Sequence, residues 1–144
     1  MAKILIISSN IHKTLAPKQL ANCLELVKKT PHVPQVELLE SGIYEIPFVI
    51  NTWHQKNPFD AYIALGLVLK TNQDHYDYIM SHVRNCLTHF ALSNIAVGNG
   101  IISGVSSDDL ASKIDNPDPC ISAYPAAVNA VNCLIKLNNN LNNA

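Results

Sequence analysis

The stretch ALGLVLKTNQDHYDYI, residues 64–79, decides the fold of this 144-residue chain. Its apolar beginning belongs to a predicted strand over Ala61–Leu69, and an unbroken apolar run bounded by a polar loop is typical of a strand buried on both faces. After the loop, apolar residues recur at helical spacing, with Tyr78, Ile79 and Val83 on one side. A buried strand, a short loop and a helix form the first part of a parallel β-α-β unit.

The loop between this strand and helix carries one histidine, His75. Asp74 fits the N-cap position of the helix, because its side chain can accept a hydrogen bond from the first turn. Ligands of open parallel sheets bind outside the carboxyl ends of the strands, and imidazole exchanges protons near neutral pH. The position therefore makes His75 a candidate for chemistry, although a histidine at a helix start more often serves as a cap or surface residue.

Strands and helices alternate along the rest of the chain. We expect strands over 3–8, 35–40, 61–69 and 95–102, and helices over 15–29, 43–55, 74–93, 107–114 and 122–138. Pro31 and Pro34 indicate a loop, and Gly98 and Gly100 are expected to break the last strand. Alternation of this kind predicts a flavodoxin-like three-layer α/β/α sandwich with a four-stranded parallel sheet.

Composition limits the classes of partner. Residues 1–138 are expected to form a single domain and residues 139–144 an asparagine-rich tail. A net charge of −1 without a basic stripe argues against a nucleic-acid partner. The chain is 48% hydrophobic and only 15% charged, which is compatible with a large interface between copies.

The sequence was also searched for membrane-spanning segments, signal peptides and cysteine motifs. No apolar run approaches the roughly 20 residues that span a bilayer, and the start of the chain lacks the pattern of a signal peptide. We therefore expect a cytoplasmic protein without a membrane partner. The four cysteines show no metal-binding spacing and are expected to be reduced packing residues: Cys23, Cys86, Cys120 and Cys133.

Three segments follow predicted strands and are expected to meet at one edge of the sheet: 8–10, 41–47 and 70–75. A fourth polar segment, 98–103, lies in or after the last strand. Its glycines would let a ligand approach the backbone closely.

Three motifs carry a resemblance to a known family: GIYEIP at 42–47, ALGLVLKTNQDHYDY at 64–78 and GNGIIS at 98–103. In this order and at these spacings, they resemble the lumazine synthases over nearly the whole chain. The resemblance implies condensation of 5-amino-6-ribitylaminouracil with 3,4-dihydroxy-2-butanone 4-phosphate to give 6,7-dimethyl-8-ribityllumazine. It implies no cofactor and no metal, because the substrates already carry a reactive amine and a ketone. The protein then supplies positioning and proton transfer.

The resemblance also assigns roles to residues. His75 matches the proton-transfer histidine of the family, Glu45 the glutamate near the ribityl chain, and Lys113 a phosphate-binding arginine. The full set of expected substrate-binding residues is Asn10, Tyr44, Glu45, Lys70, Asn72, Gln73, Asn99, Gly100 and Lys113.

Several positions depart from the family pattern. Ser9 stands where an aromatic residue commonly stacks on the heterocycle, and 70–73 lacks the glycine and threonine of the phosphate loop. Lys113 keeps a charge but loses the bidentate fork of arginine. Ser122 lies close to a position that is basic in the family. These departures motivate an alternative: a non-catalytic or weakly active relative that binds flavin or lumazine and assembles as a structural oligomer.

The resemblance further implies pentamers or larger shells, with each active site built between neighbouring subunits. The short segment before the first strand favours a pentamer or a pair of pentamers. A metal site on His75, His82 and His89 is disfavoured, because seven helical residues separate neighbours by about 10 Å. A flavodoxin that carries FMN shares the topology, but 8–13 lacks the threonine- and glycine-rich phosphate cradle.

Overall fold

The structure, a computed structural model, describes residues 1–143. Its centre is one four-stranded sheet with the order β2-β1-β3-β4, and all neighbouring pairs are parallel. The strands are β1 (Lys3–Ser9), β2 (Val33–Leu39), β3 (Ala61–Leu69) and β4 (Val97–Gly104). The predicted parallel sheet is confirmed, with β3 and β1 in its interior.

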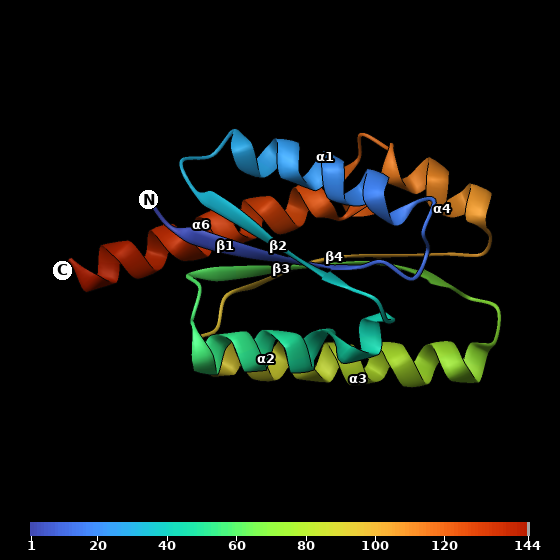
Figure 1. The fold of residues 1–144 in the computed structure, drawn as a ribbon, viewed down its shortest axis with the longest axis horizontal. Helices are drawn as coiled ribbons and strands as arrows, with labels where there is room; N and C mark the ends of the chain where they lie inside the picture. Colours follow the sequence, from blue (N-terminus) through green and yellow to red (C-terminus); the bar gives the residue numbers. More distant parts are fainter. Residues whose placement is uncertain (144) are drawn as a thin grey trace.

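Helices cover both faces of the sheet. They are α1 (Ala16–Lys28), the 3-10 turn η1 (Ile43–Glu45), α2 (Ile46–Lys56), α3 (Gln73–Leu92), α4 (Ser107–Ile114), α5 (Pro119–Ser122) and α6 (Tyr124–Asn142). Figure 1 shows α1, α4 and α6 on one face and α2 and α3 on the other. The expected flavodoxin-like three-layer sandwich is therefore confirmed.

Strand β3 joins two separate cores because its side chains alternate between the two faces. Ile63 and Leu65 pack in the cluster that includes residues of α1 and α6, whereas Tyr62 and Ala64 pack in the cluster formed with α2 and α3. All four side chains are fully buried. Burial of each large apolar side chain contributes about 1.5–3 kcal/mol, which explains the unbroken apolar run in the sequence.

Several predicted boundaries are wrong, among them those of the last strand, which was expected over 95–102 and is observed as Val97–Gly104. Pro34 lies inside β2, which tolerates it because β2 is an edge strand that pairs only with β1. Gly98 and Gly100 do not break β4, because they make room for close neighbours within a continuous strand. The helix predicted over 122–138 is split at Ala123 into α5 and α6.

The start of α3 also differs from the prediction. Asn72, not Asp74, is the N-cap, and its side chain accepts a hydrogen bond from the His75 amide. The buried face of α3 includes Val83, as expected, but Tyr78 is 64% exposed. Of the three residues predicted to lie on one buried side, Ile79 and Val83 pack against the core, and only Tyr78 does not.

The cysteines divide into buried and exposed groups. Cys23 is fully buried, and burial raises the pKa of its thiol to about 12. Cys86 is half-buried, whereas Cys120 and Cys133 are exposed. The prediction of packing residues is therefore wrong for Cys120 and Cys133, which lie on the outer sides of α5 and α6.

Ala123 has a backbone conformation that alanine rarely adopts, with φ 64° and ψ −44°. We expect Ala123→Gly to stabilise the protein by about 0.5–1 kcal/mol, because relief of about 1–3 kcal/mol of strain from this sparsely populated backbone conformation exceeds the added chain entropy of glycine. Thermal unfolding at fixed protein concentration measures this effect. Asn94, at φ 63°, is the matched control, and Asn94→Gly should gain less because asparagine tolerates this region. A lower melting temperature for Ala123→Gly would contradict the expected gain.

The end of the chain is helical for longer than expected. Helix α6 continues to Asn142, so that residues 139–142 of the expected asparagine-rich tail belong to it, while residue 144 lies outside the described residues. In residues 1–143, no helix has both the length and the apolar character that crossing a membrane requires.

Candidate functional site

Side-chain hydrogen bonds join the carboxyl ends of β1 and β2. Ser9 donates from its hydroxyl to the carbonyl of Ser41 at 2.5 Å, and Asn10 donates from its amide nitrogen to Glu40 at 3.2 Å. Lys13 also pairs with Glu40, and these hydrogen bonds, the one from Lys13 first, lower the pKa of the Glu40 carboxyl. The Asn10 amide therefore already has a partner within the chain.

His75 lies in the first turn of α3, directly after the carboxyl end of β3. Its backbone amide donates to Oδ1 of Asn72 at 3.0 Å, which fixes this turn of the helix. The imidazole itself is exposed. His75 thus lies at the carboxyl edge of the sheet, where the sequence places it, but one copy of the chain does not enclose the ring.

The residues around His75 make side-chain hydrogen bonds and a cation–ring contact within the chain. Gln73 donates from its amide nitrogen to Asp77 at 2.9 Å, one helical turn away. The ammonium of Lys70 lies 5.3 Å from the centre of the Tyr76 ring, an arrangement suited to a cation–π contact. Tyr76 in turn donates from its hydroxyl to Ser103 at 3.2 Å, which links α3 to β4.

Lys113 reaches the carboxyl end of β4 from α4. Its ammonium donates to the carbonyl of Ser103 at 2.8 Å and lies 3.4 Å from a carboxylate oxygen of Asp109. The Val105 amide donates to the same oxygen of Asp109, and this bond, followed by the one from Lys113, lowers the pKa of the Asp109 carboxyl. Lys113 also lines a cavity of about 250 Å³, together with Ser103 and Cys120.

Asn99 and Gly100 lie inside β4 rather than at its end. They pair with Ala64 and Leu65, whereas the last pair of the two strands is Leu69 with Gly104. Four residues of strand separate Leu65 from Leu69, about 13 Å. The structure therefore does not bring Asn99 and Gly100 close to the loop that carries His75 within one chain.

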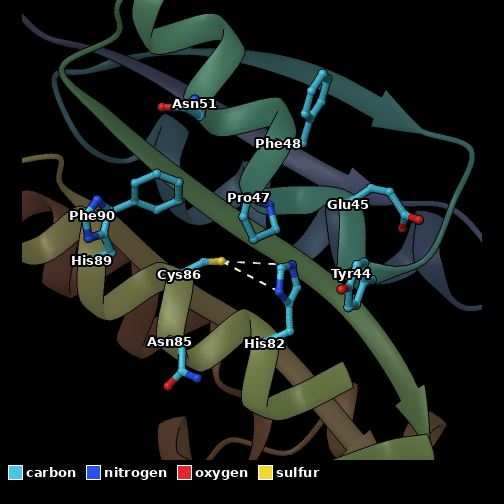
Figure 2. Close-up of a pocket in the computed structure, with 10 residues that line it drawn as sticks. All are labelled: Tyr44, Glu45, Pro47, Phe48, Asn51, His82, Asn85, Cys86, His89 and Phe90. Carbon is cyan, nitrogen blue, oxygen red and sulfur yellow. Dashed lines mark hydrogen bonds between the residues drawn. The ribbon is translucent and has the colours of Figure 1, made fainter. Parts of the chain in front are cut away.

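Tyr44 and Glu45 line a different region, a groove between α2 and α3 with a cavity of about 730 Å³ (Figure 2). The Tyr44 ring stacks on the His82 imidazole, with 3.8 Å between centroids and 18° between planes. Its hydroxyl lies 3.3 Å from that of Tyr78, and this hydrogen bond raises the pKa of Tyr44. Cys86 places its sulfur 3.9 Å from both ring nitrogens of His82.

His75 does not line this cavity between α2 and α3. His82 and Cys86, which do, were not singled out as a pair from the sequence, although their spacing of four residues puts them on one side of a helix. The part of the chain that the structure describes holds no group of three or more histidine, cysteine, aspartate or glutamate side chains arranged for a metal ion.

A parallel α/β sandwich with polar side chains at the carboxyl edge of its sheet defines a class of domains that bind small molecules at that edge. Comparison with known families is more specific. Residues 1–138 match the family described as 6,7-dimethyl-8-ribityllumazine synthase, and the chain belongs to that family.

Curated relatives carry the same description at low identity. The 6,7-dimethyl-8-ribityllumazine synthase of Jannaschia sp. (strain CCS1) is 28% identical over 119 residues, which are 78% of this chain and 63% of that relative. Those of Novosphingobium aromaticivorans and Zymomonas mobilis subsp. mobilis are 26% and 25% identical over 103 residues, 72% of this chain and 73% of each relative. The chain thus spans less than two thirds of the Jannaschia protein's length.

Proposed function

We propose that this chain is a transferase that condenses 5-amino-6-ribitylaminouracil with 3,4-dihydroxy-2-butanone 4-phosphate to give 6,7-dimethyl-8-ribityllumazine. The observation that carries the proposal is the position of His75, which follows the carboxyl end of β3 in a helix turn fixed by Asn72. This is the edge where ligands of parallel sheets bind, and family membership over residues 1–138 supports the reaction.

The proposed reaction requires the protein to position its two substrates and to transfer protons. The substrate amine attacks the ketone to form an imine with loss of water, inorganic phosphate is eliminated, and the ring then closes with loss of a second water. Each step moves protons, and an exposed imidazole can both accept and donate them near neutral pH. His75 is the group that we propose for this transfer, with Glu45 close to the ribityl chain and Lys113 close to the phosphate.

Seven further residues complete the proposed binding shell: Asn10, Tyr44, Lys70, Asn72, Gln73, Asn99 and Gly100. Their distribution over separate regions of one chain supports a site that two copies share. His75 is exposed and does not line the cavity between α2 and α3, whereas Asn99 lies inside β4 and Lys113 lies on α4. Two adjacent copies could place the β4 side of one against the His75 side of the other.

We therefore propose a homo-oligomer, a pentamer or a pair of pentamers. Phe48 on α2 is 74% exposed and Tyr78 on α3 is 64% exposed, so this face offers apolar surface to a neighbour. Light scattering coupled to size-exclusion chromatography is expected to give five or ten times the 15.8 kDa mass of one chain. A monomer at micromolar concentration would contradict both the assembly and the shared site.

Direct assay with the two substrates tests the proposed reaction. Lumazine formation, followed by its absorbance, and release of inorganic phosphate are expected to proceed in equal amounts. Phosphate release without lumazine would indicate a different reaction, and no turnover at saturating substrates would remove the catalytic proposal.

One observation favours the alternative, a relative that binds flavin or lumazine without useful catalysis. Ser9 is only 1% exposed and its hydroxyl is bonded to Ser41, so this position offers no ring on which a heterocycle could stack. Loss of one stacking partner weakens ring binding by about 0.5–1.5 kcal/mol. Riboflavin binding by fluorescence quenching, in a preparation without turnover, would support this alternative.

A further inference from the structure

The groove between α2 and α3 holds a histidine and a cysteine that the proposed reaction does not use. His82 and Cys86 lie about one turn apart on α3, and both side chains are half-buried at the cavity of about 730 Å³. The Cys86 sulfur lies 3.9 Å from each ring nitrogen of His82, and Figure 2 shows it turned toward the imidazole. The groove therefore contains a thiol paired with an imidazole.

The His82 ring is held in place by a contact that leaves its nitrogens available. It stacks on the Tyr44 ring, with 3.8 Å between centroids and 18° between planes. Stacking uses the faces of the two rings, whereas the nitrogens lie at the ring edge. Among residues 1–143, the Cys86 sulfur is the only hydrogen-bond partner of either nitrogen, and a thiol is a weak donor and a weak acceptor. The pair thus offers a positioned nitrogen whose present partner is a weak one.

The separation of the two side chains suits one metal ion between them. A metal–sulfur bond of about 2.3 Å and a metal–nitrogen bond of about 2.0 Å span about 4.3 Å when they lie in line. The observed 3.9 Å between sulfur and nitrogen is slightly shorter. Because the sulfur is equally far from both nitrogens, coordination by one of them requires a rotation of the Cys86 side chain, and the groove leaves room for it.

The lining of the groove favours a cation. Among the described residues, no lysine or arginine lines it, whereas Glu45 contributes a carboxylate. His89 lines it as well, but it lies seven residues after His82, about 10 Å along the helix axis, and does not complete the pair. Residues 1–143 contain no group of three side chains arranged for a metal ion, so the pair is a site with two protein ligands.

The number and type of ligands select the ion. Zinc sites take three or four protein ligands, whereas thiolate and imidazole both suit copper, and copper(I) is stable with two ligands. We propose that Cys86 and His82 form a two-coordinate site for copper(I). The ion replaces the thiol proton, which is released to water, and no electron is transferred. The site does not depend on the proposed reaction.

Competition with the copper(I) chelator bicinchoninate, under anaerobic conditions on the full chain, tests the proposal. The native protein is expected to take up one copper(I) per chain. Cys86→Ser removes the soft ligand at nearly constant size, and His82→Phe keeps a ring that can stack on Tyr44 but removes the nitrogen. Each substitution should lower the affinity at least about 100-fold, because a metal site gains its affinity from a few ligands. Cys133→Ser, which removes an exposed thiol on α6, is the matched control and should keep the native affinity.

Three results would overturn the proposal: no copper(I) uptake by the native chain, native affinity in Cys86→Ser, or native affinity in His82→Phe. The last would mean that the thiol binds without the imidazole. A further measurement needs no variant. Because binding releases a thiol proton, the affinity of the native chain should rise by up to about tenfold for each pH unit. An affinity that does not change with pH would contradict a thiolate ligand.

Discussion

Replacement of His75 by alanine is expected to lower the rate of lumazine formation by at least about 100-fold, the lower end of what a positioned general acid–base contributes. The substitution removes an exposed imidazole, while the hydrogen bond from residue 75 to Asn72 uses the backbone amide and persists. The fold and the mass of the assembly should therefore not change. Initial rates at saturating substrates, with the mass measured on the same sample, check both parts.

His89 provides the matched control, because it is an exposed histidine on the same helix, in its last turn. His89→Ala should retain the native rate. An equal loss of rate in both variants would point to disturbance of α3 rather than loss of a proton-transfer group. Native turnover in His75→Ala would remove His75 from the proposed role altogether.

Most of the fold could be predicted, because the burial of a strand or of a helix face requires a regular pattern of apolar residues in the sequence. Strand β3 was predicted with its observed bounds, Ala61–Leu69, since both of its faces contact a core and every side chain had to be apolar. Helix α4 was also predicted with its observed bounds, Ser107–Ile114, and Ser106 caps it by accepting from the Asp109 amide at 3.0 Å. Periodicity and caps are local signals, so a single sequence carries them.

Boundaries of helices and strands that depend on tertiary contacts could not be predicted from the sequence. Pro34 indicated a loop, because a proline in a central strand would lose a ladder bond, but the sequence alone does not show that β2 is an edge strand. The split at Ala123 was similarly hidden, since nothing local predicts a positive φ at an alanine. In both cases the surrounding structure overrides the preference of the residue.

The candidate site could likewise be predicted only in part. The edge of the sheet and the position of His75 followed from topology, and topology followed from the alternation of strands and helices. Pairings between side chains did not follow. The stack of Tyr44 on His82 joins η1 to α3, and the contact of Lys113 with Ser103 joins α4 to β4. Such pairs depend on how elements lie in space, for which spacing in the sequence gives no measure.

Gly98 has a structural role that makes its substitution the most destabilising one we expect. A Cβ at this position would lie 2.6 Å from the carbonyl oxygen of Ala127 and 3.1 Å from its Cα, both backbone atoms of α6. Helix α6 packs across β4, and a backbone cannot yield as a flexible side chain can. Gly98→Ala should therefore destabilise the protein by about 3 kcal/mol, the upper end of ordinary overpacking, and lower its melting temperature by about 10 °C.

Gly42→Ala is the control for this substitution, because a Cβ at Gly42 would meet nothing within 4 Å and its φ of −75° suits any residue. Alanine there should leave the stability unchanged or raise it by up to about 1 kcal/mol, through the lower entropy of the unfolded chain. Thermal unfolding of the two variants at the same protein concentration is the measurement, since an oligomer melts in a concentration-dependent way. Equal melting temperatures would mean that α6 does not lie against β4 at this distance, and the packing that closes this face of the sheet would then have to be revised.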